Sequence, residues 1–434
     1  MFRNMSRSES RPSTVNVDPA VDIQHTLADT LAYARQREYA GWDYVDGMSS
    51  RLLQALPVES KWLNLAVQET VKRAPINLRP LFLVEQRRNF KGTALFAMAN
   101  LTAADVIDHQ SQNINGDTPG LKPVDYRNEV RPLLDWLIDN QSNGFSGFCG
   151  GHQHTIQGLH HQGPINDPDL VSTSYAVRAL LRGATLDCEY AKVARTAVEW
   201  AVDDMEYREV DAGAKITYYP KHPDDAYTLN AGAIAARMFI DLYAYFDDES
   251  LLRYGEELLR YIASEQTSIG GWYYRVPADS SHLSMDNHHN GFIIEAFQRH
   301  RDVTGSSMFT STYERALEFY RTTLFDASGA PHWDETSEYP RDIHAAAQGI
   351  LVFTYAGEFD FARQIIRWAC QNLSDGDGRF FFRQHRFYTK RITLMRWCQA
   401  WMAYALSEYL AARYGPGVNQ FGRTHPSDAT RPEF

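Results

Sequence analysis

The sequence predicts an all-α protein, an (α/α) toroid of about six helical hairpins with one loop-lined cleft. Two observations lead to this fold class. Apolar residues recur three and four positions apart over many segments, whereas the alternation typical of strands is nearly absent. A short Gly-aromatic element also returns at regular intervals after the helical segments, which is the pattern of a repeated structural unit.

The helical periodicity covers most of the chain. It marks the ranges 123–140, 190–206, 229–246, 251–265, 310–323, 358–373 and 391–413. No GxGxxG or Walker loop is present, so a nucleotide-binding fold has no support.

The Gly-aromatic element occurs five times, about fifty to seventy residues apart, which is the length of one helical hairpin with its loops. The copies are GFSGF at 144–148, GAKITYY at 213–219, GGWYY at 270–274, GAPHW at 329–333 and GDGRFFF at 376–382. Hairpins that bury one face against their neighbours form an arc, and five or six can close into a double ring with these loops at one end. An open solenoid is the alternative, and the small number of repeats favours closure.

Domain boundaries follow from composition. Residues 1–20 and 415–434 are rich in Ser, Pro, Arg, Asn and Thr and offer too little apolar surface to offset the entropy of ordering. We therefore expect two disordered tails around a single toroid domain at 21–414.

Charge and cysteine content exclude several classes of protein. A net charge of -11 without a long basic run argues against nucleic-acid binding. The four cysteines form no CxxC pair, which fits a reducing cytoplasm. Neither a signal peptide nor a membrane span is evident, so we expect a cytoplasmic protein that associates at most peripherally with a membrane.

Aromatic residues make up 13% of the chain, and many stand beside Gly in loops. Rings in such loops can stack on sugars, which makes Trp272, Tyr274 and Tyr339 candidate substrate-binding residues. A Tyr-rich helical core is the alternative interpretation.

The segment SMDNHHNGF at 284–292 is the first candidate site. Asp286 or Asn287 is suited to cap the helix that follows. Two histidines beside them exceed what a cap needs, and an Asp near imidazoles can hold a proton in place for acid or base chemistry. Asp286 is therefore a candidate catalytic residue, and Asn287 and His289 are candidate binding residues.

The segment YPRDIHAAAQ at 339–348 is the second. Asp342 is a plausible N-cap, which would place His344 in the first helical turn. There the helix dipole disfavours the imidazolium and keeps the ring neutral, a state suited to a base or a hydrogen-bond donor. A structural histidine at a helix start is the alternative.

The segment 380–401 interleaves basic and aromatic residues. In an acidic protein this mixture favours uronate or sulfate groups and sugar faces over phosphates and bases. The candidate binding residues here are Arg383, Arg391, Arg396 and Trp397, and Tyr388 is a candidate catalytic residue. One of Arg391 and Arg396 can instead pair with an Asp in the helical wall.

Four histidines crowd the segment CGGHQHTIQGLHHQGP at 149–164. The pair His152 and His154 raises a zinc hypothesis, but no Cys or Glu stands at a diagnostic spacing. We expect a binding loop here, and neither a metal nor a cofactor.

Together these segments resemble a family of α/α-toroid proteins from archaeal and bacterial surface-glycan gene clusters, related to the VpsJ-like polysaccharide biosynthesis proteins. The phrases that carry this resemblance are RAPINLRPLF at 73–82, KGTALF at 91–96, GFSGFCG at 144–150, VSTSYAVRALL at 171–181, LNAGAIAARM at 229–238, DNHHNGF at 286–292, YPRDIHAAAQ at 339–348 and RFYTKRITLMRWCQAWMAYALS at 386–407. The segment 270–305 is also distantly similar to the catalytic domain of glucuronyl C5-epimerases.

The resemblance implies a carbohydrate-active protein of surface-glycan assembly that epimerises C5 of a uronic acid in an oligosaccharide, either free or lipid-linked. That reaction needs two acid/base groups and a cation for the enolate-like charge. We expect His344 and Tyr388 to transfer protons, and Arg391 or Arg396 to hold the carboxylate.

Two alternatives remain open. A glycoside hydrolase could use Asp286 and Asp342 as its acid and base, because α/α toroids commonly host hydrolases. A glycan-binding or scaffolding subunit without activity is the third class, and the fold alone does not decide among them.

Overall fold

The computed structural model describes residues 19–113, 123–159, 162–220 and 226–415. The expected tails, 1–20 and 415–434, lie almost wholly outside these residues. Pro19 and Ala20 already belong to the first helix, and Gly415 directly follows the last one.

Six helices form an inner ring in the described part of the chain. They are α4 (Phe90–Asn113), α6 (Leu170–Gly183), α9 (Leu229–Phe246), α11 (Asn287–Thr304), α13 (Ile343–Tyr355) and α15 (Trp401–Tyr414). Each packs against the next in this order, and α15 packs back against α4, which closes the ring. The predicted (α/α) toroid of about six hairpins is confirmed.

An outer helix precedes each inner helix in the chain. The outer elements are α1 (Pro19–Arg35), α5 (Pro123–Asp139), α7 (Glu189–Arg195) with α8 (Ala197–Glu199) and the π-helical turn η2 (Trp200–Asp204), α10 (Glu249–Ser264), α12 (Thr310–Thr323) and α14 (Phe359–Asn372). Because outer and inner helices alternate, every connection from an outer to an inner helix lies at the same end of the ring.

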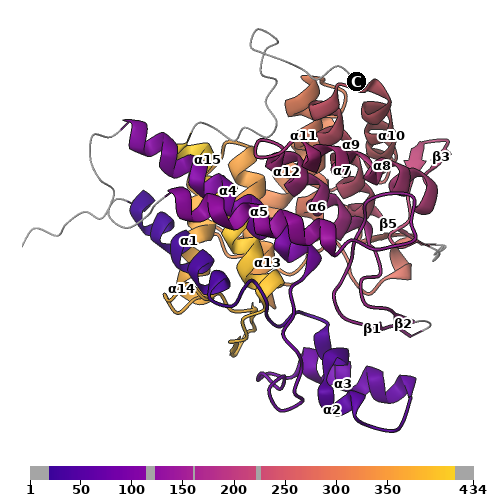
Figure 1. Cartoon of the computed structure of the whole chain (residues 1–434). Coiled ribbons are helices and arrows are strands. Elements are labelled where there is room, and N and C mark those ends of the chain that lie inside the picture. Colours follow the sequence, from indigo (N-terminus) through magenta and orange to yellow (C-terminus); the bar gives the residue numbers. More distant parts are fainter. Residues whose placement is uncertain (1–18, 114–122, 160–161, 221–225, 416–434) are drawn as a thin grey trace, which may run out of the picture.

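The connections carry the short elements. The helical turns are η1 (Asp46–Ser49), α2 (Arg51–Gln54), η3 (Ala278–Ser280) and the π-helical η4 (Met395–Ala400), and α3 (Lys61–Arg73) is a longer helix. The strands are β1 (Ile156–Gln157), β2 (Gln162–Gly163), β3 (Arg208–Val210), β4 (Gly213–Lys215), β5 (Tyr227–Thr228), β6 (Arg275–Val276), β7 (Arg341–Asp342), β8 (Arg383–Gln384) and β9 (Thr389–Lys390). They pair antiparallel as β1-β2, β3-β4, β5-β6 and β7-β8-β9. Figure 1 shows α2 and α3 standing apart from the ring, near β1 and β2.

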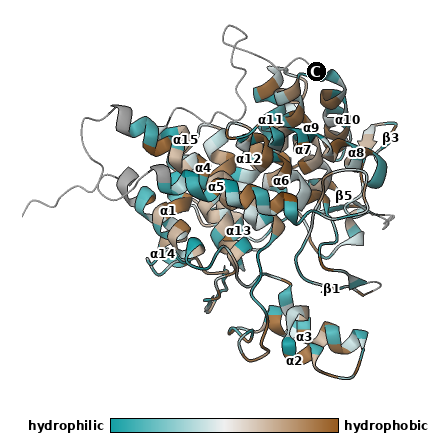
Figure 2. Cartoon of the chain, viewed as in Figure 1, coloured by the Kyte–Doolittle hydropathy of each residue, from teal (hydrophilic) through white to brown (hydrophobic). Residues whose placement is uncertain are grey.

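Burial distinguishes the inner helices from the outer ones. The inner helix α9 is buried at every residue from Leu229 to Tyr243, so it is surrounded on all sides. The outer helix α10 buries Leu251, Gly255, Leu258, Leu259 and Ile262, which is one face of an amphipathic helix. Hydrophobic and hydrophilic residues likewise mix along the outer helix α5 (Figure 2).

The glycines of the sequence repeat are turn positions. The first glycine of every copy has a positive φ, namely Gly144, Gly213, Gly270, Gly329 and Gly376. At Gly270 a Cβ atom would also come within 2.5 Å of the carbonyl oxygen of Arg315. The repeat therefore marks where the chain leaves an outer helix, in a conformation that glycine adopts at little cost.

A buried ion pair ties four inner helices together. Arg182 of α6 donates two hydrogen bonds to Glu408 of α15, at 2.8 and 3.1 Å. Thr102 of α4 and Tyr355 of α13 donate to the same carboxylate, at 3.2 and 2.9 Å. Glu408 is fully buried, so its charge depends on these partners.

We predict that Glu408→Gln lowers the free energy of unfolding by about 3–5 kcal/mol, because it leaves the buried guanidinium of Arg182 without a counter-charge. Urea unfolding measures the loss. The exposed pair Lys192–Glu189 is the control, and Glu189→Gln should change stability by less than about 1 kcal/mol. Equal effects of the two substitutions would contradict the importance of the buried pair.

Candidate active site

Polar side chains gather where the inner helices begin. Asp169, Asp286 and Asp342 are the N-caps of α6, α11 and α13, and each accepts a hydrogen bond from a backbone N–H of its helix. All three carboxyl groups are buried. A buried helix start needs such acceptors for its unpaired N–H groups, so the same residues that start the helices bring negative charge to one end of the ring.

Asp286 orients two imidazoles. Its Oδ2 lies 2.7 Å from Nδ1 of His289, and its Oδ1 lies 3.2 Å from Nδ1 of His288. Burial works against ionisation of Asp286, but both imidazoles and the hydrogen bonds outweigh it, so the pKa of this carboxyl lies below its usual range. An ionised carboxylate at Nδ1 leaves Nε2 of each ring as the atom that can exchange protons with a ligand.

His344 lies next to these rings. Asp342 caps α13 by accepting from the backbone N–H of His344 at 2.8 Å, so the predicted N-cap and first-turn position are confirmed. The ring centroid of His344 is 4.7 Å from that of His288, and 4.4 Å from that of Trp401, on which it stacks. Although His344 is buried, neither ring nitrogen has a hydrogen-bond partner among the described residues.

Both of these imidazoles are neutral. Burial lowers the pKa of His288 and of His344 well below the usual value, because a low-dielectric environment disfavours the charged ring. For His344 the next contributions are the positive charges of Lys91 and Arg396. The direction of this pKa shift agrees with the neutral His344 expected from the sequence, and burial is its largest cause.

Asp342 also joins the site to the segment after α14. Its Oδ1 accepts from Nε1 of Trp397 at 2.8 Å, and its Oδ2 accepts a short hydrogen bond from Nε of Arg383. The ring of Trp397 lies 4.7 Å from that of His344. The predicted residues Arg383, Trp397 and His344 thus meet around one carboxylate.

Arg396 is committed to a different carboxylate. It donates to both oxygens of Asp43, at 2.8 and 2.7 Å. Asn89 and the backbone N–H of Tyr44 also donate to Asp43, at 2.9 and 2.6 Å. Of the two arginines Arg391 and Arg396, Arg396 is thus the one that pairs with an Asp in the wall.

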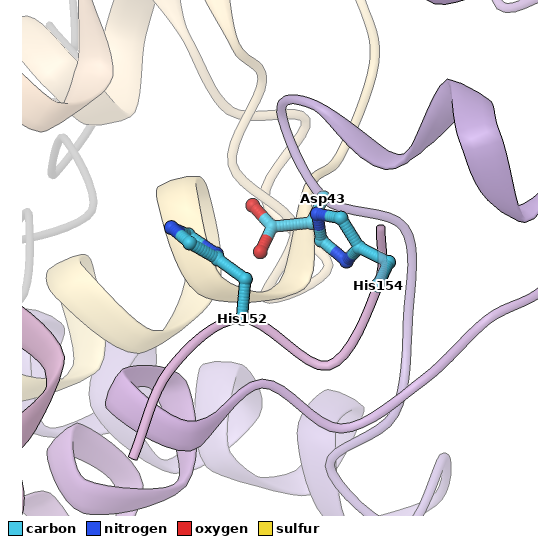
Figure 3. A group of neighbouring side chains, drawn as sticks. All are labelled: Asp43, His152 and His154. Carbon is cyan, nitrogen blue, oxygen red and sulfur yellow. The ribbon is translucent and has the colours of Figure 1, made fainter. Parts of the chain in front are cut away.

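His152 and His154 flank the same carboxylate (Figure 3). Ligand atoms of these two residues and of Asp43 lie within 4.8 Å of one another, so their geometry alone resembles a metal centre. A carboxylate offers about four lone-pair positions, and four donors already occupy those of Asp43. A metal ion would have to displace at least one of these donors, so we interpret this group as a hydrogen-bonded part of the wall.

Two predicted site residues, Tyr388 and Arg391, lie away from the imidazoles. Tyr388 is 45% exposed beyond β8 and stacks on His385, and Arg391 is exposed and lies over the ring of Phe381. We therefore assign neither of them a role in catalysis.

Trp272 and Asn287 are core residues. Trp272 is 1% exposed and donates to the carbonyl of Ile262, and the amide of Asn287 bonds Leu324 and Tyr320. Neither side chain is open to a ligand, so the interpretation as substrate-binding residues is wrong for both. Trp272 instead fits the alternative interpretation, in which the aromatic residues belong to the core.

A groove borders the site on the side of His289. It has a volume of about 610 Å³ and runs along Tyr274, Arg275 and the segment 279–283. The half-buried ring of Tyr274 lies 4.5 Å from that of His289, so this predicted residue connects groove and imidazoles. Tyr339 is half-buried as well, with Arg341 over its ring.

Sequence reasoning missed two residues at the same end of the ring. Lys91, in the first turn of α4, is 7% exposed, and Asp169 caps α6 and is 1% exposed. A lysine at the start of an otherwise apolar helix, within KGTALF, was the one available signal.

We predict that the neutral imidazoles make stability depend on pH. In the unfolded chain His288 and His344 bind protons as the pH falls below about 6.5, whereas in the folded chain they do not. The free energy of unfolding should therefore drop between pH 7 and 5.5, by up to about 1.4 kcal/mol per pH unit for each ring. Urea unfolding should show a smaller drop for His344→Gln and an unchanged drop for His282→Gln, since His282 is exposed. Equal drops in all three proteins would contradict the burial of a neutral His344.

No family model matches the chain, and no curated protein matches it either. The likeness to VpsJ-like proteins therefore stays a prediction. Among solved structures, a GH76 α-mannanase of Bacteroides thetaiotaomicron is similar with a TM-score of 0.57 and 12% identity over 91% of this chain and 98% of that one. A sugar epimerase from a ruminal bacterium has a TM-score of 0.58 and 12% identity over 91% and 99%. The cellobiose 2-epimerase of Bacillus thermoamylovorans has a TM-score of 0.56 and 12% identity over 75% and 89%.

Likenesses at such low identity show the fold alone. The chain has the α/α-toroid fold that is also present in glycoside hydrolases and sugar epimerases.

Proposed function

We propose that the chain is a sugar epimerase that inverts C5 of a uronic acid residue in an oligosaccharide. One observation carries the proposal, namely the buried pair of neutral imidazoles, His288 and His344, with ring centroids 4.7 Å apart and a carboxylate behind His288. A neutral imidazole can accept a proton, and the carboxylate of Asp286 stabilises the imidazolium that then forms on His288.

His288 is the base in this proposal. Its Nε2 takes the proton from C5, and the electron pair of the C–H bond moves into the adjacent carboxylate. The imidazolium that forms lies 3.2 Å from the ionised Asp286, which stabilises its charge. His289, which Asp286 also holds, lies against Tyr274 of the groove and in this proposal contacts the sugar.

The charge on the carboxylate needs its own stabilisation. A neutral His344 supplies one N–H as a donor, because its ring nitrogens have no other partner among the described residues. Arg383 and Arg396 are both paired with carboxylates, Asp342 and Asp43, and Arg391 is exposed. We assign the role of the cation to Arg383, because its charge acts on both His288 and His344.

Hydrolysis is less well supported by the two carboxylates suggested for it. Asp286 and Asp342 both cap helices, and both already accept from neighbouring side chains, Asp286 from His289 and Asp342 from Trp397 and Arg383, so neither is free to act on a glycosidic bond. We also keep the expectation that the substrate belongs to a surface glycan handled in the cytoplasm, at most peripherally to a membrane. In the described part of the chain, no helix combines the length and apolarity of a membrane span.

His344→Gln tests the proposal. Gln keeps the size of the side chain and an amide donor, but it lacks the rigid ring that stacks on Trp401 and fixes the direction of the N–H group. We expect epimer formation on a uronate oligosaccharide, followed by NMR, to fall about a hundredfold or more while the melting temperature changes little.

The matched control is His300→Gln on the same helix as His288. His300 is buried and lies 3.0 Å from Glu256, away from the imidazole cluster. This substitution should lower stability and leave turnover intact. Full activity of His344→Gln, or the release of free sugar without any epimer, would rule out the proposed reaction.

A further inference from the structure

Inversion at a carbon atom requires proton transfer on two opposite sides. His288 and His344 cannot supply both, because a sugar ring between two groups needs about 7 Å, twice a normal van der Waals contact. Their ring centroids are only 4.7 Å apart, so both rings approach a substrate from one side. A second proton-transfer group must therefore come from another part of the ring.

The helical ring points to α4. Its order is α4, α6, α9, α11, α13 and α15, so α4 lies across the ring from α11, which carries His288. Lys91 is in the first turn of α4, at the end of the ring where α11 also begins. Topology thus places an amine opposite the imidazole base.

The electrostatic neighbours of Lys91 show which way it faces. Its charge acts on His344 of α13 and on Asp169, the cap of α6. These two residues belong to inner helices on different sides of α4. The amine of Lys91 therefore lies within electrostatic range of two separate inner-helix starts, at the end of the ring that holds the site.

Lys91 has no partner of its own in the described part of the chain. No hydrogen bond or ion pair joins it to another described residue, although it is 7% exposed. Oδ2 of Asp169 is also buried and without a hydrogen-bond partner among these residues. Nζ of Lys91 is not one of the fully enclosed atoms without a partner, so the amine has no protein partner and remains accessible to a ligand. A ligand-directed role explains this arrangement better than a structural one.

We propose that Lys91 is the second acid/base residue of the site, on the side of the sugar opposite His288. This inference rests on the proposed function. In one direction His288 takes the proton from C5, and the ammonium of Lys91 gives a proton to the other face of the same carbon. Lys91 ends as a neutral amine and His288 as an imidazolium, and exchange with solvent restores both.

The protonation states agree with this step. Burial lowers the pKa of Lys91 to about 7, with a further contribution from Arg396, while Asp169 and Asp43 act in the opposite direction. Near neutral pH a protonated Lys91 therefore coexists with a neutral His288. Above pH 7 the ammonium is lost, so kcat/KM should fall, approaching tenfold per pH unit.

The test separates removal of the proton from inversion. The protein is incubated in deuterated water with each of a panel of uronate oligosaccharides. With the oligosaccharide that it accepts, the wild type should place deuterium at C5 and form the epimer. Lys91→Met should still exchange the C5 proton through His288, with retained configuration, while epimer formation falls about a hundredfold or more.

Lys91→Arg distinguishes proton transfer from charge. Arginine keeps the positive charge but stays protonated, so it should fail to restore inversion. Lys390→Met is the control for removal of a buried lysine, since Lys390 is 3% exposed and donates to the carbonyl of Lys72. It should leave epimer formation unchanged.

Each outcome is decisive. Undiminished epimer formation by Lys91→Met, or full rescue by Lys91→Arg, overturns the role of Lys91 and leaves the proposed function standing. A wild type that neither exchanges nor epimerises any uronate oligosaccharide overturns the proposed function itself. Lys91→Met should also melt no lower than the wild type, because it removes an unpaired buried charge, and a marked loss of stability would indicate a structural role instead.

Discussion

Capping of the inner helices is the constraint on which the site depends. A ring of six buried helices exposes six helix starts to one another, and their unpaired N–H groups need acceptors where water has little access. Asp169, Asp286 and Asp342 meet this need. Because their carboxylates lie at one end of the ring, they can also hold imidazole, indole and guanidinium groups. Structural and chemical demands thus fall on the same residues.

The site combines strongly paired charges with unpaired groups. Arg396 and Asp43, like Arg383 and Asp342, satisfy each other and fix the wall of the site. Lys91 and the ring nitrogens of His344 have no such partners in the described residues. Other buried polar atoms, such as Nε1 of Trp200, also lack partners, so it is the position of Lys91 and His344 at the helix starts that suggests a reactive role.

The sequence was sufficient for the fold class and for part of the site. Outer helices such as 251–265 are amphipathic, and their periodicity was visible. The inner helices α4 and α13 are buried on nearly all sides, so they show little polar–apolar period and were not recognised by it. The N-caps of α11 and α13 were visible in the sequence at Asp286 and Asp342. Periodicity does not show which residues meet across the ring. For this reason the sequence did not point to Lys91, and it suggested a catalytic role for Tyr388, which lies exposed.

Comparison with solved structures does not decide the chemistry, because the same toroid is present in hydrolases and in epimerases. The most direct test of the account is the primary kinetic isotope effect on a uronate oligosaccharide that carries deuterium at C5. If the imidazole cluster breaks the C5–H bond in a slow step, the deuterated substrate should react several times more slowly than the protiated one. Turnover without an isotope effect, accompanied by cleavage of the glycosidic bond, would contradict the account.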